Sequence, residues 1–321
     1  MRAAQIVAPR RFDIVDIADP EIGSEPPGSI LVKTQRSALC GSDMPAFALS
    51  HPSSDYPLPA GQSMHECIGV IAASKSDQYR EGDEVLAFPR GKDGLAEYFV
   101  AHETATVALP EHDNKNRMVL AQSLGTVIWA CRKLGNLLNH HTVVVGQGPM
   151  GLLMAHMLSN LGARTVIATD LLDYRLAVSN RMGATHTINV SNQDAVTAVA
   201  DITHGSMADL VVEVVGHQTD TINECLRLVK PGGTIMAFGV PDQKVYEFQF
   251  SDFFRKNAHF IGAVGQEFHS DVPLAIAMIQ RGRIDVSPII THQLRFTEAQ
   301  HGFELSLHKR DAAIKIFFKY D

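Results

Sequence analysis

The chain has 321 residues, of which 45% are hydrophobic and 20% are charged, and its formal net charge is −7. This length suffices for two domains, at about 100–200 residues per domain, and the negative charge argues against nucleic acid or an anionic membrane as a partner. No apolar run approaches the ~20 residues that span a bilayer, and the N-terminal residues lack the apolar segment of a signal peptide. The 4 cysteines are scattered, so we expect reduced thiols in a cytoplasmic protein.

The first part of the chain, up to about residue 115, consists of short apolar stretches separated by Pro, Gly and Ser residues. Residues 30–34, 67–72 and 83–87 are typical strands of this kind, and residues 90–94 form one of the turn-like clusters. This pattern predicts an all-β or barrel-like domain.

Beyond this region the spacing of apolar residues becomes helical at 117–134, and from residue 142 strands alternate with helices. Six strands with helical crossovers predict a doubly wound parallel sheet, and the fold class is therefore α/β. After about residue 271 we expect one helix, at 272–280, and a closing strand at 313–318. The six strands are predicted at residues 142–145, 165–169, 186–189, 210–215, 234–238 and 260–264.

Three glycines follow the first of these strands at Gly-x-Gly-x-x-Gly spacing. Gly146 permits a tight turn, Gly148 lets the backbone approach a pyrophosphate, and Gly151 allows the next helix to pack closely. Phosphates would lie at the N-terminus of that helix, where unpaired N–H groups and the helix dipole favour negative charge. The predicted cofactor-binding residues of this loop are Gly146, Gly148, Pro149, Met150 and Gly151.

An acid follows the second strand of this region. Asp170 lies nineteen residues past Gly151 and is placed to accept hydrogen bonds from both hydroxyls of an adenosine ribose. It would repel a 2′-phosphate, and Asp173 adds a second negative charge nearby. With strand, helix and acid in register, dinucleotide binding is favoured over a plain glycine-rich turn, and NAD is favoured over NADP.

The order of these regions resembles the medium-chain dehydrogenase/reductase superfamily, in particular its zinc-dependent alcohol and polyol dehydrogenase branch. The resemblance implies a discontinuous GroES-like β-rich catalytic domain, residues 1–118 and 266–321, whose tail packs back on its front. It also implies an NAD-binding Rossmann domain at residues 119–265. The resemblance rests on Cys40-Gly41-Ser42-Asp43, His65-Glu66 followed by Gly69, Gly82-Asp83-Glu84-Val85, the 146–151 loop, and the tail pattern from Gly282-Arg283-Ile284 to Ile289-Ile290-Thr291.

Matched residue by residue, the resemblance implies one catalytic zinc, which would lower the pKa of an alcohol oxygen while a nicotinamide takes the hydride. Cys40 and His65 look like two zinc ligands, and Asp43 looks like the carboxylate that orients the His65 imidazole. Ser42 looks like the hydroxyl that takes the substrate proton. Glu66 looks like the acid that stands behind the metal.

The third protein ligand departs from the family pattern. Gln122 stands where polyol-branch relatives usually offer a glutamate, and a neutral amide oxygen is a weaker donor. Zinc would then be held less tightly, or by a substitute. The candidates for that substitute are Glu66 and, in the loop before His65, His51 or Asp55.

The proton relay and the second metal site also differ from the family pattern. Pro45 replaces a histidine that often relays the proton, so Ser42 would pass its proton through water, the ribose or His51. The structural-zinc lobe, with its four closely spaced cysteines, is absent from the sequence. At most one metal is therefore expected.

Two basic residues complete the cofactor site that the resemblance implies. Arg175 is close to Asp170, and its family-like role is stacking or contact near the adenosine. Lys315 matches a basic residue that reaches the cofactor pyrophosphate. The alternative for Lys315 is a solvated lysine on an edge strand.

The leading hypothesis is a zinc-dependent oxidoreductase that transfers hydride between a secondary alcohol or polyol and NAD. One alternative is a metal-free, NADPH-dependent quinone or enone reductase of the same superfamily. Another is a catalytically impaired nucleotide-binding protein. The substrate would be a small-molecule alcohol or carbonyl compound. A homodimer or homotetramer is expected, because relatives pair across a two-fold axis near strand 234–238.

Overall fold

The computed structural model describes residues 1–49, 55–111, 114–216, 220–241 and 243–320. The chain divides into two compact units: unit 1 is Met1–Gly125 with Glu267–Asp321, and unit 2 is Thr126–Gln266. The division falls inside α2 (Lys115–Cys131). None of the helices in the described ranges combines the length and apolar character needed to cross a membrane.

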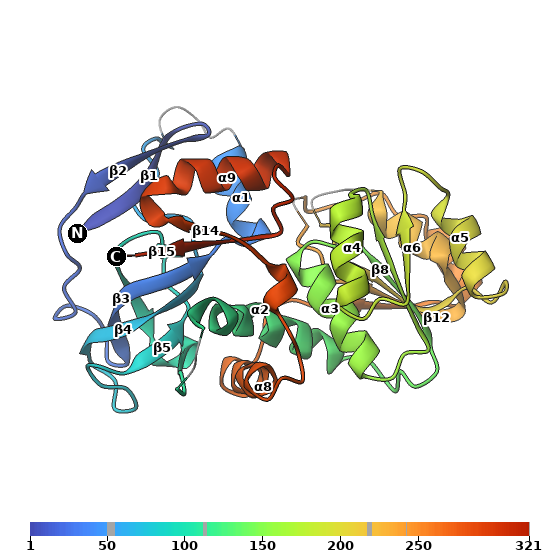
Figure 1. Ribbon diagram of the computed structural model, residues 1–321, viewed down its shortest axis with the longest axis horizontal. Helices are drawn as coiled ribbons and strands as arrows, with labels where there is room; N and C mark the ends of the chain where they lie inside the picture. Colours follow the sequence, from blue (N-terminus) through green and yellow to red (C-terminus); the bar gives the residue numbers. More distant parts are fainter. Residues whose placement is uncertain (50–54, 112–113, 217–219, 242, 321) are drawn as a thin grey trace. The chain divides into compact units, whose positions relative to one another are not determined.

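Unit 1 is built on a mixed sheet of 7 strands in the order β14-β15-β3-β4-β5-β7, with β6 paired to β3 (Figure 1). A separate hairpin pairs β1 with β2. The prediction of a β-rich front is confirmed, and the three example strands lie in β3, β4 and β5. The strands of this unit are β1 (Arg2–Ala8), β2 (Arg11–Asp16), β3 (Ser29–Ala38), β4 (Glu66–Ser74), β5 (Glu84–Ala87), β6 (Tyr98–His102), β7 (Thr106–Ala108), β14 (Ile290–Arg295) and β15 (Lys315–Lys319).

Three neighbouring strands bring distant parts of the sequence together at one end of the sheet. Ala38, at the end of β3, pairs with Glu66 at the start of β4 and with Phe317 of β15. The N–H of Leu39 donates to the carbonyl of Ile316 at 2.9 Å. The residues that follow β3, those that begin β4 and those that begin β15 are therefore neighbours.

The tail of the chain contains more structure than the sequence predicted. The expected helix is present as α8 (Phe268–Gln280), but a second helix, α9 (Ala299–His308), and strand β14 follow it. The expectation of one tail helix was therefore wrong. Gly302 interrupts the helical pattern of α9, yet it is needed there, because a Cβ at this position would lie 2.6 Å from the Phe318 ring.

An aromatic cluster packs α9 against the front of unit 1. The Phe303 ring of α9 lies 4.8 Å from the Phe12 ring of β2 and 5.3 Å from the Phe47 ring of α1 (Met44–Ala48), between ring centroids. All three side chains are buried, and such pairs contribute about 0.5–1.5 kcal/mol beyond the area they bury. The tail thus packs back on the front, as the family resemblance implies.

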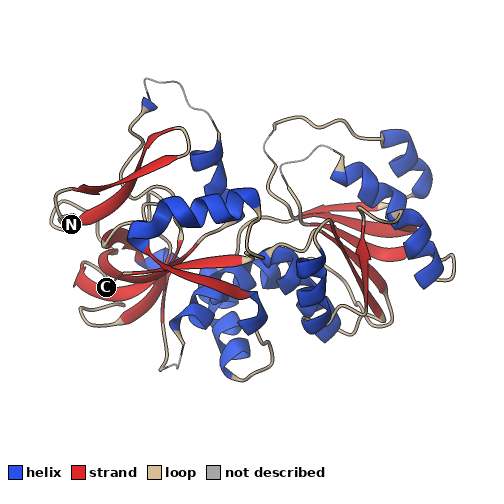
Figure 2. Ribbon diagram, turned by 45° about the horizontal axis from the view of Figure 1, so that its top comes forward, coloured by secondary structure: helices blue, strands red, loops and turns tan. Residues whose placement is uncertain are grey.

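Unit 2 is a parallel sheet of 6 strands in the order β10-β9-β8-β11-β12-β13. Helices α3 and α4 cover one face and α5 and α6 the other, so the prediction of a doubly wound sheet is confirmed (Figures 1 and 2). All six predicted strands are present, with β11 and β12 beginning earlier than expected. The elements are β8 (His141–Val145), α3 (Pro149–Asn160), β9 (Thr165–Asp170), α4 (Asp173–Arg181), β10 (His186–Asn189), α5 (Ala195–Ile202), β11 (Ala208–Glu213), α6 (Thr221–Leu228), β12 (Val229–Ala237), α7 (Phe250–Lys256) and β13 (His259–Gly262).

The glycine loop between β8 and α3 has the geometry that its spacing predicts. Gly146 has φ +95°, which permits the turn out of β8. A Cβ on Gly148 would meet no protein atom within 4 Å, whereas a Cβ on Gly151 would lie 1.9 Å from the carbonyl oxygen of Gly146. The third glycine therefore allows α3 to pack on the first glycine of the loop, and the second leaves open space beside the backbone.

We expect Gly151→Ala to destabilise the protein by about 1–3 kcal/mol, because a backbone carbonyl blocks the new methyl group. Gly148→Ala is the matched control, since its φ of −68° suits alanine and the site is open. Thermal unfolding without added ligand measures both variants. Equal melting temperatures for the two would contradict the packing described.

Candidate functional site

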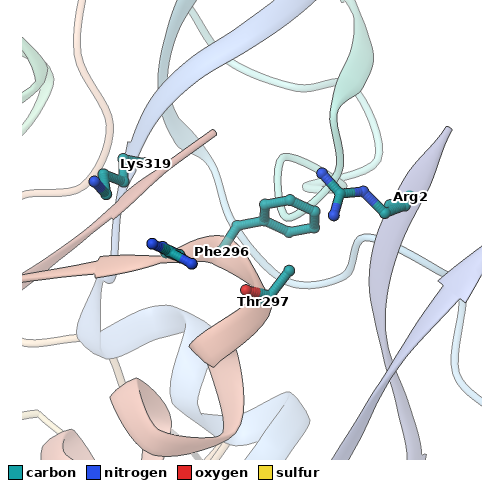
Figure 3. Close-up of a pocket in the computed structure, with 5 residues that line it drawn as sticks. Arg2, Phe296, Thr297 and Lys319 are labelled. Carbon is teal, nitrogen blue, oxygen red and sulfur yellow. The ribbon is translucent and has the colours of Figure 1, made fainter. Parts of the chain in front are cut away.

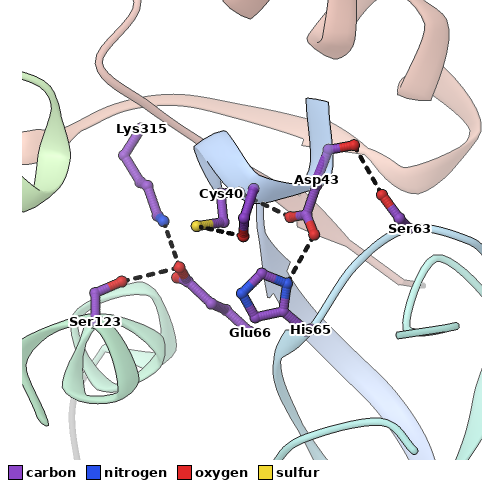
Figure 4. A network of polar contacts seen from close by, with 8 residues as sticks. Cys40, Asp43, Ser63, His65, Glu66, Ser123 and Lys315 are labelled. Carbon is purple, nitrogen blue, oxygen red and sulfur yellow. Dashed lines mark hydrogen bonds and ion pairs between the residues drawn. The ribbon is translucent and has the colours of Figure 1, made fainter. Parts of the chain in front are cut away.

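Side chains of the types that bind metal ions cluster in unit 1 where β3 ends and where β4 and β15 begin (Figure 4). One donor atom from each of Cys40, His65 and Glu66 lies within 4.8 Å of the other two. His65 and Glu66 are buried, and Cys40 is partly buried. The structure thus brings together the two expected zinc ligands and the acid expected behind the metal.

Asp43 fixes the orientation of this cluster from η1 (Gly41–Asp43). Its Oδ1 lies 2.7 Å from His65 Nδ1, its Oδ2 accepts from the N–H of Cys40 at 2.9 Å, and its carbonyl accepts from the Ser63 hydroxyl. A carboxylate at Nδ1 keeps that nitrogen protonated, so the lone pair of a neutral ring is on Nε2. Asp43 therefore has the contacts expected of a carboxylate that orients a histidine ligand.

The charge of the cluster favours a cation. Burial lowers the pKa of the His65 imidazole, but Asp43 and Cys40 raise it by more, to about 11. In the metal-free protein a proton on His65 supplies the positive charge that these groups attract. A metal ion bound by the ring would replace that proton, so metal binding releases it to solvent.

Glu66 has one oxygen engaged and one free of hydrogen bonds. Its Oε1 accepts from the Ser123 hydroxyl at 2.9 Å and from the Lys315 ammonium at 2.8 Å. Its Oε2 is buried and accepts no hydrogen bond from the residues that the structure describes. A thiolate, an imidazole and a carboxylate oxygen are ligands that zinc prefers, so this donor set fits a zinc ion.

The structure contradicts one of the two places expected for Lys315, the solvated position on an edge strand. The side chain is 1% exposed, and β15 lies between β14 and β3, so it is not a solvated lysine on an edge strand. Burial lowers the pKa of its ammonium, but the charges of Glu66 and Cys40 raise that pKa above its usual value. An ammonium has three N–H donors, so the contact with Glu66 is compatible with the predicted contact to a cofactor pyrophosphate, which stays a prediction. Lys315 thus lies in the same cluster as Glu66.

The other residues predicted for the metal site differ in whether the structure places them near the cluster. The Ser42 hydroxyl donates to Cys40 Sγ at 3.3 Å, so the proposed proton acceptor contacts the cluster. His51 lies outside the described residues. Gln122 is buried on α2, and the hydroxyl of the next residue, Ser123, reaches Glu66. Sequence reasoning missed Ser123, whose only signal was its place directly after Gln122, the residue that replaces the family's glutamate.

In unit 2, Asp170 lies beside the glycine loop, as predicted. Its carboxylate accepts from the N–H groups of Gln147, at 2.7 Å, and Leu172, at 3.0 Å. Arg175 Nη1 lies 3.7 Å from Asp170 Oδ2. Helix α3 begins at Pro149 without a side-chain cap, so its first-turn N–H groups suit a phosphate.

Gln147, between the first two glycines, is a further residue that the motif did not indicate. Its side chain is fully buried, donates to the carbonyl of Val144 at 2.9 Å and accepts from the Ser179 hydroxyl at 2.9 Å. The residue thus connects β8, the glycine loop and α4. The loop is therefore held in shape by protein contacts alone.

Each unit also contains a hollow. In unit 2 a largely apolar cavity of about 590 Å³ lies at the carboxyl ends of β11, β12 and β13, where open α/β sheets bind ligands. In unit 1 a hollow of about 350 Å³ is lined by cationic and aromatic side chains (Figure 3). The Arg2 guanidinium there lies 5.3 Å from the centre of the Phe296 ring and is ion-paired with Glu97. The residues lining this second hollow are Arg2, Arg295, Phe296, Thr297 and Lys319.

Comparison with known proteins places these sites in a family context. Residues 149–281 match the family model described as zinc-binding dehydrogenase, and residues 26–111 match the alcohol dehydrogenase GroES-like domain. An alcohol dehydrogenase of Cupriavidus necator is 26% identical, over 99% of this chain and 98% of that protein. A sorbitol dehydrogenase of Bacillus subtilis is 24% identical, over 98% and 96%. The solved alcohol dehydrogenase of Thermus sp. ATN1 superposes with a TM-score of 0.87 at 24% identity, over 100% of both chains.

Proposed function

Because this chain belongs to the medium-chain dehydrogenase/reductase superfamily, in its zinc-dependent branch, we propose that it transfers hydride between a secondary alcohol or polyol and NAD. The observation that supports this most strongly is the convergence of Cys40, His65 and Glu66. A metal-free quinone or enone reductase would have no use for such a donor set.

The proposed zinc site consists of Cys40 and His65, completed by Glu66 or Gln122. When bound, zinc supplies Lewis acidity that lowers the pKa of the substrate hydroxyl, and the nicotinamide supplies the hydride acceptor. The protein's own contribution is positional. Asp43 holds the imidazole in one orientation. The Ser42 hydroxyl lies beside Cys40, and in that position it would accept the substrate proton.

The proposed cofactor site is the glycine loop with Asp170 and Arg175. The pyrophosphate would contact the N-terminus of α3, at residues 148–151. The Asp170 carboxylate would accept hydrogen bonds from the ribose hydroxyls, and a 2′-phosphate there would meet a buried negative charge. This supports NAD as the cofactor over NADP.

The purified protein is expected to contain about one zinc per chain and to reduce NAD with a member of a panel of secondary alcohols and polyols. Cys40→Ser should lose both the metal and the activity, because a hydroxyl replaces the thiolate ligand. Cys131→Ser, which alters a buried thiol of unit 2, is the control and should keep the metal. Elemental analysis and the absorbance of NADH provide the measurements. Full activity in a metal-free preparation would favour the reductase alternative instead.

The unmodified protein should bind NAD at least about tenfold more tightly than NADP, a difference of roughly 1.4 kcal/mol. Asp170→Ser should narrow or reverse this ratio, whereas Asp173→Asn, which removes a charge three residues further along the chain, should change it less. Fluorescence titration with each cofactor measures the affinities. Because Asp170 also accepts a hydrogen bond from the glycine loop, its replacement should weaken the binding of both cofactors. The ratio of the NAD and NADP affinities therefore reports the contact with the ribose. Equal affinities in the unmodified protein would refute the assignment.

The proposed assembly is a homodimer or homotetramer. Strand 234–238, near which the interface was expected, corresponds to β12 and lies one position inside the sheet, and β13 forms the edge. Apolar side chains on and around this edge are exposed, with Phe260 at 47%, Phe254 at 70% and Val264 at 83%. An open edge with exposed apolar residues supports pairing with a second copy. Light scattering that gives a monomer mass at every concentration would rule the assembly out.

A further inference from the structure

We propose that Ser123 is a positioning residue of the metal cluster, which holds Glu66 in the orientation of a metal ligand. This inference rests on the zinc site proposed above. Ser123 follows Gln122 on α2, and its side chain is 3% exposed. Its hydroxyl donates to Glu66 Oε1 at 2.9 Å.

The two donors to Glu66 come from different parts of the chain. Ser123 reaches the carboxylate from α2 and Lys315 reaches it from the start of β15, and both engage Oε1 (Figure 4). Two fixed donors on one oxygen define the rotation of the carboxylate. With Lys315 as the lone donor, the carboxylate would be free to turn and offer either oxygen to the ammonium. Ser123 thus keeps Oε1 occupied and leaves Oε2 available to a cation.

The remaining oxygen has the environment of a ligand atom. Glu66 Oε2 is buried and takes no hydrogen bond from any described residue, which is costly for a charged oxygen unless a cation satisfies it. Glu66 also lies within 4.8 Å of the donor atoms of Cys40 and His65. The charge that the neutral Gln122 cannot supply is therefore supplied by Glu66.

The change that tests this role is Ser123→Ala, which leaves Lys315 as the donor to Glu66 Oε1. Loss of a group that orients a metal ligand costs about 10–100-fold in metal affinity, and we expect about tenfold weaker zinc binding. Ser123→Thr retains the hydroxyl and should restore most of the affinity. Ser37→Ala removes an equally buried hydroxyl of the same unit, one that contacts Tyr320, and should bind zinc like the unmodified protein.

Zinc affinity is measured on the full chain without substrate, by competition with a chromophoric chelator. The electronic spectrum of the cobalt-substituted protein is the second measurement, because its bands report the ligand set. Ser123→Ala should shift these bands toward those of Glu66→Gln. Thermal unfolding confirms that each variant is folded.

A double-mutant cycle separates positioning from a general structural effect. In a Glu66→Gln background, Ser123→Ala should cause little further loss of zinc affinity, because the group it orients has been altered. An equal loss in both backgrounds would overturn the proposal, as would unchanged affinity and an unchanged cobalt spectrum in Ser123→Ala. If the unmodified chain bound no zinc, the zinc site would fail together with this inference. A zinc-binding protein insensitive to Ser123→Ala would refute the inference alone.

Discussion

Burial of negative charge in one small region of unit 1 is the constraint on which the rest of the site depends. Asp43 and Glu66 are both almost inaccessible to solvent, and Cys40 lies beside them. A negative charge in an apolar interior needs hydrogen bonds or a nearby cation. The Lys315 ammonium supplies one cation at Glu66, and the proposed zinc ion would supply a second beside Cys40, His65 and Glu66. Strand pairing brings all of these groups together.

The sequence predicted those features that depend on local pattern. The six strands of unit 2 follow from apolar runs alternating with helical spacing, and the loop at Gly146 follows from a fixed spacing of glycines. The boundaries of the strands were predicted less accurately, since β12 begins at Val229, five residues before its predicted start. Helix α9 was missed because Gly302 weakens its pattern, although packing against Phe318 requires a glycine there.

The contacts that complete the candidate metal site could not be predicted from local pattern. Lys315 and Glu66 are separated by 249 positions, and Ser123 and Glu66 by 57. Only the register of β3, β4 and β15 and the approach of α2 bring them together. Family resemblance singled out Cys40, His65 and Asp43, and the structure brings these three side chains together. It did not indicate the contact between Lys315 and Glu66, because a motif records residue types and not which distant side chains the fold brings into contact.

The tie between Gln147 and Ser179 has a consequence for how this cofactor loop can change over time. Both side chains are buried, and the Ser179 hydroxyl lies within hydrogen-bond distance of Gln147 Oε1 and of the Arg175 carbonyl. An apolar residue at position 147 therefore leaves the hydroxyl an acceptor in its own helix, whereas Ser179→Ala leaves the Gln147 oxygen buried without its donor. The dependence between these two positions, 32 residues apart in the chain, runs in one direction. Loss of the glutamine can precede loss of the serine, but the reverse order leaves an unsatisfied oxygen in the interior.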